Sequence, residues 1–250
     1  MRNSLDFALL LADMAPILCE STAFPFRDGW VNHHPDSSSI YPSQNLNRVD
    51  HFGIRDEGQP VDLEELAAHF SSAENAFFHL SESRLAPTFR AMFDGLRWKK
   101  QRAEMSLLWR EPDPSATQSP FIRPAIGLAE ASELGSPIRM ARLFDHPGAH
   151  LLVWDNGFGV DGFAALYQLG DTAYLGDAMT REGCRGRGIQ TALIQYRLRL
   201  AADLGCRDVL VETYDWLPSS FANLCRTGFQ EVMRREIYRI ATPNRSSKGG

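Results

Sequence analysis

Apolar positions recur at helical spacing in several parts of the first hundred residues. They lie three and four residues apart in residues 5–20 and 62–70, which predicts an amphipathic helix in each segment. Residues 86–96 predict a third helix, because Pro87 falls in its first turn and Gly95 lies near its end. Residues 105–109 form a short apolar run, which predicts a buried strand.

Beyond residue 120 the pattern changes to strands joined by tight turns. The predicted elements follow in the order strands 151–154, 160–169 and 172–179, a helix from about 189 to 204, a strand at 209–213, a helix at 219–227 and a strand at 232–240. Asn156-Gly157 and Gly170-Asp171 are the turn signals between the first three strands. Strands and helices in this succession predict an α+β fold.

A proline-rich segment separates the two patterns. Residues 111–120 hold three prolines among small polar residues, and each proline fixes its own φ and restricts the residue before it. We therefore predict a semi-rigid linker at 111–120 between an N-terminal domain, residues 1–110, and a C-terminal domain, residues 121–250.

Composition narrows the class of protein. The 250 residues are 44% apolar and 23% charged, with 26 basic against 31 acidic side chains, which is typical of a globular protein. A net charge of −5 gives no basic excess for nucleic acid. Asp6 and Asp13 interrupt the apolar start, so neither a signal peptide nor a membrane span is predicted there. We expect a cytoplasmic protein that binds neither nucleic acid nor membrane.

The four cysteines give no metal motif. Cys19, Cys184, Cys206 and Cys225 form no C-x-x-C pair and have no histidine at ligand spacing, so no metal site is predicted. Reduced thiols are the preferred interpretation, with disulfides as the alternative.

The segment before the long helix carries the candidate chemistry. Arg185, Gly186, Arg187 and Gly188 follow a predicted strand and precede a predicted helix. Glycines allow the backbone to approach a ligand closely, and the free amides of a helix N-terminus bind phosphate. Arginines add charge-assisted donors. The alternative is a simple connecting turn with solvated arginines.

The same segment resembles the acetyl-coenzyme A (acetyl-CoA) loop, R-x-x-G-x-[GA], of the GNAT acetyltransferase superfamily. Arg185 and Gly188 match, and Gln190 replaces the final glycine or alanine. The similarity continues through the G-x-Q-T-A-L start of the helix at 188–193 and through Asn223, Gly228 and Phe229. It covers about residues 121–240.

The resemblance implies a GNAT fold: a mixed, mostly antiparallel central sheet flanked by helices. Residues 45–53 and 95–109 are similar to the N-terminal halves of tandem GNAT proteins, so residues 1–110 are expected to be a degenerate GNAT-like domain that walls the acceptor pocket. No R-x-x-G-x-G occurs before residue 120.

The resemblance also implies the cofactor-binding residues, with acetyl-CoA as cosubstrate. Ala178, Met179 and Thr180 would line the pantetheine arm, and Asn223 would reach the same arm. The pyrophosphate would lie over the amides of Arg185, Gly186, Arg187, Gly188, Ile189, Gln190 and Thr191.

The family pattern identifies the catalytic residues less clearly than the cofactor-binding residues. The position where many GNAT enzymes carry a proton-donating tyrosine is Leu224, so Tyr214 and Tyr238 are the candidate substitutes, and unassisted departure of the thiolate is the other option. Asp177 and Glu212 are candidate general bases for an ammonium group.

Two functions remain open from the sequence. One is an N-acetyltransferase acting in a ternary complex on an amine of a small molecule or a protein. The other is a catalytically silent acyl-CoA-binding module, in which Leu224 and Gln190, the two departures from the family pattern, would reflect a loss of catalytic activity. Arg197 and Arg199 with the loop arginines suggest a basic patch, but cofactor phosphate explains the loop pair better than RNA. The acceptor is not readable from the sequence, and a homodimer is one of the oligomeric states left open.

Overall fold

The structure is a computed structural model, and it describes residues 22–26, 29–33, 48–51, 62–70, 76–82, 85–134, 144 and 146–241. The helix predicted at 5–20 lies outside the described residues.

The chain divides into two compact units. Unit 1 comprises residues 1–105 and 233–250, and unit 2 comprises residues 106–232. Both division points fall inside strands, namely β5 (Lys99–Arg110) and β11 (Gln230–Arg239). This division differs from the predicted linker at 111–120, because strand pairing brings the C-terminal strand into unit 1.

Unit 1 combines a sheet with two helices. Its remaining elements are β1 (Thr22–Phe26), β2 (Gly29–His33), β3 (Arg48–His51), α2 (Leu63–His69), β4 (Phe77–Ser81) and α3 (Ala86–Gly95). The strands follow the order β1-β2-β3-β4-β11-β5. β3 and β4 are parallel, and β4 and β11 are antiparallel. The helices predicted at 62–70 and 86–96 are confirmed, and the strand predicted at 105–109 is longer.

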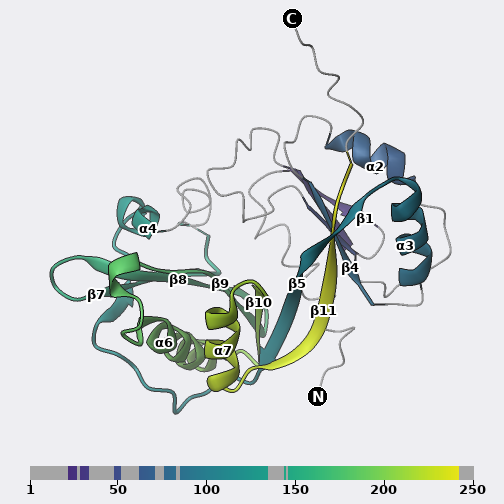
Figure 1. The fold of residues 1–250 in the computed structure, drawn as a ribbon. Helices are drawn as coiled ribbons and strands as arrows, with labels where there is room; N and C mark the ends of the chain where they lie inside the picture. Colours follow the sequence, from purple (N-terminus) through teal and green to yellow (C-terminus); the bar gives the residue numbers. More distant parts are fainter. Residues whose placement is uncertain are drawn as a thin grey trace, which may run out of the picture. The chain divides into compact units, whose positions relative to one another are not determined.

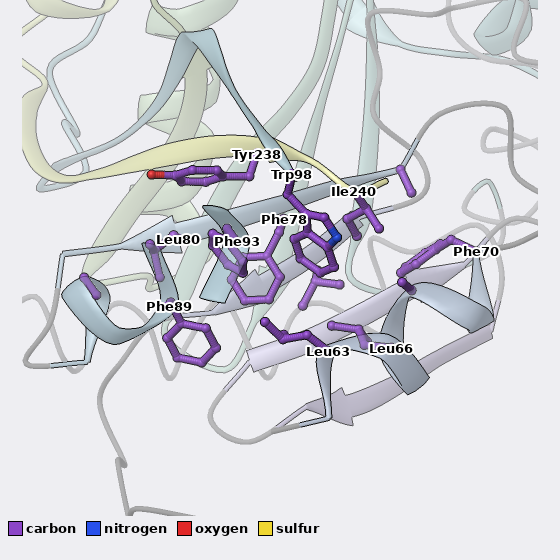
Figure 2. Packing of buried hydrophobic residues seen from close by; sticks show 14 residues of the cluster. Leu63, Leu66, Phe70, Phe78, Leu80, Phe89, Phe93, Trp98, Tyr238 and Ile240 are labelled. Carbon is purple, nitrogen blue, oxygen red and sulfur yellow. The ribbon is translucent and has the colours of Figure 1, made fainter. Parts of the chain in front are cut away.

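The core of unit 1 is aromatic. Local signals begin its helices: Asp62 caps α2 by accepting from the amides of Glu64 and Glu65, and a proline lies in the first turn of α3. Buried side chains from both helices and from β3, β4 and β11 then pack together with Trp98, which lies directly before β5 (Figure 2). Phe93 is fully buried at their centre, with its ring 4.7 Å from Tyr238 and 4.9 Å from Trp98.

Unit 2 contains the predicted hairpins and the long helix (Figure 1). Its elements are β6 (Ile122–Pro124), α4 (Leu128–Leu134), β7 (Ala149–Asp155), β8 (Val160–Leu169), β9 (Thr172–Thr180), the 3-10 turn η2 (Glu182–Cys184), α6 (Ile189–Asp203), β10 (Asp208–Tyr214) and α7 (Pro218–Arg226). The strands follow the order β5-β10-β9-β8-β7-β6. Only β9 and β10 are parallel among the pairs of β6 to β10. The predicted mixed, mostly antiparallel sheet is confirmed.

Helix α6 lies closely against β8. A Cβ atom on Gly162 of β8 would stand 2.5 Å from Cγ2 of Ile189 and 3.3 Å from Cδ1 of Leu193. Only a residue without a side chain allows this approach. Gly162 therefore sets how close the first turn of α6 comes to the sheet.

The proline-rich segment at 111–120 packs along α6. The amide of Asp113 donates to the carbonyl of Leu198 (3.2 Å), and the amide of Thr117 donates to Gln195 Oε1 (3.3 Å). Ala116 packs against the buried cluster beneath the helix. The segment is irregular in backbone, as predicted, and it is part of unit 2, packed along α6.

Among the helices in the described part of the chain, none combines the length and the apolar character needed to cross a membrane.

Candidate active site

Strands β9 and β10 separate in the middle of unit 2. They pair in parallel from Thr172 and Asp208 as far as Leu175 and Val211. Both strands continue beyond that point, β9 to Thr180 and β10 to Tyr214. Residues 176–180 therefore extend beyond the parallel pairing with β10, although Gly176, Met179 and Thr180 stay paired with β8. Ala178 and Met179 are exposed. Residues 176–180 include the three predicted to line the pantetheine arm.

A bulge in β9 accompanies the separation. Ala165 of β8 lies opposite Gly176 and Phe163 lies opposite Met179, so two residues of β9 face one residue of β8. Asp177, in the bulge, has a φ of 43°, in the left-handed region that non-glycine residues rarely adopt. A bulge bends its strand and increases the local twist. The bulge lies directly after the point where the pairing of β9 with β10 ends.

The glycine loop leads directly into the long helix. Gly186 and Gly188 have φ values of 78° and 80°, which glycine adopts without strain. The Ala192 amide donates to the Gly188 carbonyl (3.0 Å), so the three amides before it have no helical carbonyl to bond. Arg185 and Arg187 are exposed beside them. Free amides, a helix dipole and two guanidinium groups fit an anionic ligand such as the pyrophosphate of coenzyme A.

Gln190, which departs from the family motif, connects the helix to β9. Its Nε2 donates to Oγ1 of Thr180 at 2.8 Å. Thr180 is buried at the end of β9. The longer side chain is therefore accommodated by a hydrogen bond between the first turn of α6 and the end of β9.

Each of the two predicted base residues accepts a hydrogen bond from a tyrosine. The Tyr167 hydroxyl donates to Asp177, and the Tyr174 hydroxyl donates to Glu212 at 3.0 Å. Tyr167 and Tyr174 lie opposite each other in the β8–β9 hairpin, with ring centroids 6.4 Å apart. Two tyrosine–carboxylate pairs therefore lie near the point where the strands separate.

Neither tyrosine was among the residues singled out from the sequence. The signal that could have found them is their equal distance from the Gly170-Asp171 turn, which pairs Tyr167 with Tyr174 in a two-residue hairpin.

The candidate proton donors lie in different settings. Leu224 is 3% exposed and packs in the core below β10, so no proton donor stands at this position. Tyr214 is half-buried at the end of β10, with its ring 5.1 Å from that of Trp216.

Tyr238 is 5% exposed in the core of unit 1, where its hydroxyl donates to Glu236 at 2.9 Å. Burial and that hydrogen bond raise the pKa of Tyr238 to about 12. Its contacts are those of a packing residue.

Asn223, predicted to reach the pantetheine arm, lies half-buried on α7. Its side-chain oxygen accepts a hydrogen bond from Arg226. The alternative of a basic patch is not supported by the helix arginines, because Arg197 is buried and Arg199 pairs with Asp203 at 3.0 Å. Among the described residues, no three His, Cys, Asp or Glu side chains come together in a group that could hold a metal ion.

A mixed sheet whose parallel strands separate beside a glycine loop and a helix N-terminus defines an acetyltransferase fold of the α+β class. The chain belongs to the GNAT family: the model of the "Acetyltransferase (GNAT) family" matches residues 105–229, half of the chain. No curated protein matches the sequence.

Solved structures share the fold at low sequence identity. A GCN5-related N-acetyltransferase from Kribbella flavida is 13% identical with a TM-score of 0.62, covering all of this chain and 97% of its own. A tandem GNAT protein from the clavulanic acid biosynthesis pathway is 16% identical with a TM-score of 0.54, covering 79% and 75%. A GCN5-related N-acetyltransferase from Sphaerobacter thermophilus is 15% identical with a TM-score of 0.52, covering 66% of this chain, which spans 59% of that protein.

Proposed function

We propose that this protein is an N-acetyltransferase that transfers the acetyl group of acetyl-CoA to an amine of a small molecule or a protein. The observation that carries the proposal is the separation of β9 from β10 beside the glycine loop at the start of α6. Beyond Leu175 the side of β9 that faced β10 no longer pairs with that strand, which leaves space for the amide groups of a pantetheine arm. The loop and the first turn of α6 offer amides to the phosphates.

The reaction is a direct transfer. The amine nitrogen attacks the thioester carbonyl carbon, a C–N bond forms, and the C–S bond breaks with the electron pair leaving on sulfur. The nitrogen then loses its remaining extra proton to water to give the neutral amide. An alkylammonium ion must first lose a proton, and a carboxylate beside the reacting atoms assists this step.

We assign the removal of this proton from the ammonium group to the carboxylate of Glu212. Its carboxylate lies on β10 beyond the last paired residue, and it accepts from Tyr174. Asp177 lies in the bulge, where its carboxylate accepts from Tyr167. The proposal therefore predicts that Glu212→Gln lowers kcat more than Asp177→Asn does.

The departing thiolate needs no side-chain acid in this scheme. Leu224 has no proton to give, and a thiolate is a good leaving group that takes its proton from water. The buried Leu224 also favours a second candidate function, a silent acyl-CoA-binding module. Turnover is what distinguishes the two.

A thermal-shift measurement tests the cofactor first. Acetyl-CoA at a hundred times its Kd adds about 2.7 kcal/mol of stability. For a protein of this size that is about 5–10 °C in Tm. NAD and ATP are the controls, and Gly188→Trp is expected to abolish the shift by filling the loop. An unchanged shift in that variant would contradict the loop assignment.

An assay of thiol release against a panel of amines then tests the reaction. Thiol release above background supports the transferase, with Glu212→Gln as the matched loss-of-function variant. Saturable acetyl-CoA binding without thiol release for any amine would support the silent module. The absence of any acetyl-CoA binding would contradict both.

A further inference from the structure

Arg197 is a charged residue on the buried face of α6. The other buried residues of this helix are apolar, namely Ile189, Leu193, Ile194, Leu198 and Ala201. Arg197 itself is 2% exposed. Removing a guanidinium group from water costs several kcal/mol unless hydrogen bonds replace the lost hydration. The groups that Arg197 bonds are therefore informative about its role.

Arg197 bonds backbone carbonyls at the bulge of β9. Its Nη1 donates to the carbonyls of Ala165 (3.0 Å) and Gly176 (3.3 Å). These two residues are the register partners directly before the bulge. Its Nε donates to the Leu193 carbonyl one turn earlier in α6 (3.1 Å), which fixes the direction of the side chain. The guanidinium group thus joins α6 to Ala165 and Gly176, the residue pair of β8 and β9 that directly precedes the bulge.

Tyr167 lies against two residues at the bulge, Gly176 and Asp177. The Tyr167 hydroxyl donates to the carboxylate of Asp177, the bulge residue with the left-handed backbone. A Cβ atom on Gly176 would stand 2.7 Å from the ring of Tyr167, so that ring lies directly over the strand. A left-handed non-glycine residue costs of order 1–3 kcal/mol and persists only where its surroundings fix it.

Arg197 is also charged at neutral pH. Burial lowers its pKa to about 10, while the nearby negative charge of Asp177 acts to raise it. A protonated guanidinium group makes stronger hydrogen bonds to carbonyls than a neutral donor does.

We propose that Arg197 is a positioning residue: with Tyr167 and Asp177 it holds the bulge of β9, so that residues 178–180 present their backbone to the pantetheine arm of acetyl-CoA. This role rests on the proposed function. Arg197 touches no substrate in this scheme and acts only through β9.

The test compares two probes that share the nucleotide end of acetyl-CoA. Acetyl-CoA needs both the loop and the β9 backbone, whereas adenosine 3′,5′-bisphosphate has no pantetheine arm. Calorimetry on Arg197→Met is expected to show acetyl-CoA binding weakened about tenfold or more, the equivalent of one lost charged hydrogen bond. Binding of adenosine 3′,5′-bisphosphate stays within about twofold of wild type. Arg197→Lys, which keeps the charge and one donor, recovers part of the loss.

Three controls keep the test decisive. Arg199→Met removes a half-exposed arginine from the same helix and leaves both affinities unchanged. Tyr167→Phe removes only one hydroxyl group, so it tests the role of the bulge if Arg197→Met does not fold. It is expected to weaken the binding of acetyl-CoA and to leave the binding of adenosine 3′,5′-bisphosphate unchanged. Hydrogen exchange of the ligand-free protein reports the bulge directly, with faster exchange at residues 176–180 than in wild type and little change in α7.

The outcomes separate the two proposals. Wild-type protein that bound no acetyl-CoA would overturn the proposed function and this role with it. Wild-type binding together with unchanged acetyl-CoA affinity in Arg197→Met and Tyr167→Phe would leave the proposed function standing and overturn the role of Arg197. Equal weakening of both probes would show general damage to the helix–sheet packing and would also overturn it.

Discussion

Gly162→Ala is expected to displace the first turn of α6 and weaken acetyl-CoA binding without a direct contact to the ligand. The added Cβ would lie 2.5 Å from Cγ2 of Ile189. Ordinary contact between carbon atoms is about 3.5–4.0 Å, so one of the two groups must move by about 1 Å. Ile189 is β-branched, buried and the first residue of α6, so its methyl group does not rotate away freely.

The displacement has two expected effects. Overpacking of this kind lowers stability by about 1–3 kcal/mol, with a Tm shift of about 2–4 °C for each kcal/mol. The first amides of α6 move with Ile189, and a shift of about 1 Å in positioned groups can lower activity by about a hundredfold. Urea unfolding measures the loss of stability, calorimetry measures the weaker binding of acetyl-CoA, and the thiol-release assay measures the loss of activity.

Gly183→Ala is the matched control. It makes the same chemical change near the loop, at a glycine whose added Cβ meets no atom within 4 Å and whose φ is not positive. The double variant Gly162→Ala/Ile189→Ala removes the clashing methyl group and should recover part of the lost affinity. If Gly162→Ala matched Gly183→Ala in both stability and affinity, the close packing of α6 on β8 would be refuted.

Three further predictions concern stability. Phe93→Ala should lower the free energy of unfolding by about 3–5 kcal/mol in a urea titration, because Phe93 is fully buried among aromatic rings (Figure 2). Met92→Ala, at a half-exposed neighbour, is the control. A loss in Phe93→Ala no larger than in Met92→Ala would contradict this core. Burial alone would raise the pKa of Glu236, but hydrogen bonds from Lys100, Arg90 and Tyr238 lower it from 4.5 to about 2. Its contribution, at most about 3 kcal/mol, is therefore present above pH 4.5 and lost as the pH falls to 2. The stability difference between wild type and Glu236→Gln should shrink between pH 6 and pH 2, and a constant difference would argue against this network. Gly188→Ala should lower the free energy of unfolding by about 1–2 kcal/mol through left-handed backbone strain, and it should weaken acetyl-CoA binding. If Gly188→Ala and Gly183→Ala unfolded at the same temperature, the loop would have relaxed and the expected strain would be absent.

Local chemistry determined most of what the sequence predicted correctly. Asp62 caps the start of α2, Pro87 lies in the first turn of α3, and the turn at Gly170-Asp171 sets the register of the β8–β9 hairpin. The glycines of the loop were identified because their conformational freedom is a property of the residue itself. Elements of this kind depend on neighbours a few positions apart, so periodicity and turn chemistry are enough to find them.

Pairing between distant segments was decided only by the tertiary structure. β11 pairs with β4, about 160 residues earlier in the chain, which places residues 233–239 of the last strand in unit 1, whereas the predicted boundary placed them in the C-terminal domain. The sequence of residues 230–239 does not indicate that β4 is the strand it pairs with. The proline-rich segment at 111–120 likewise packs on α6 through contacts with Leu198 and Gln195 that its composition does not indicate.

The site shows the same division. The sequence by itself determined a loop suited to phosphate, and the family pattern drew attention to Asp177 and Glu212. The bulge, the end of β9–β10 pairing at Leu175, and the burial of Arg197 against the carbonyls beside the bulge came only from the folded chain. An arginine at a helical position looks like a solvated charge until the backbone groups that bond it are known. Those groups lie about 20 and 30 residues away, at positions that strand register alone decides.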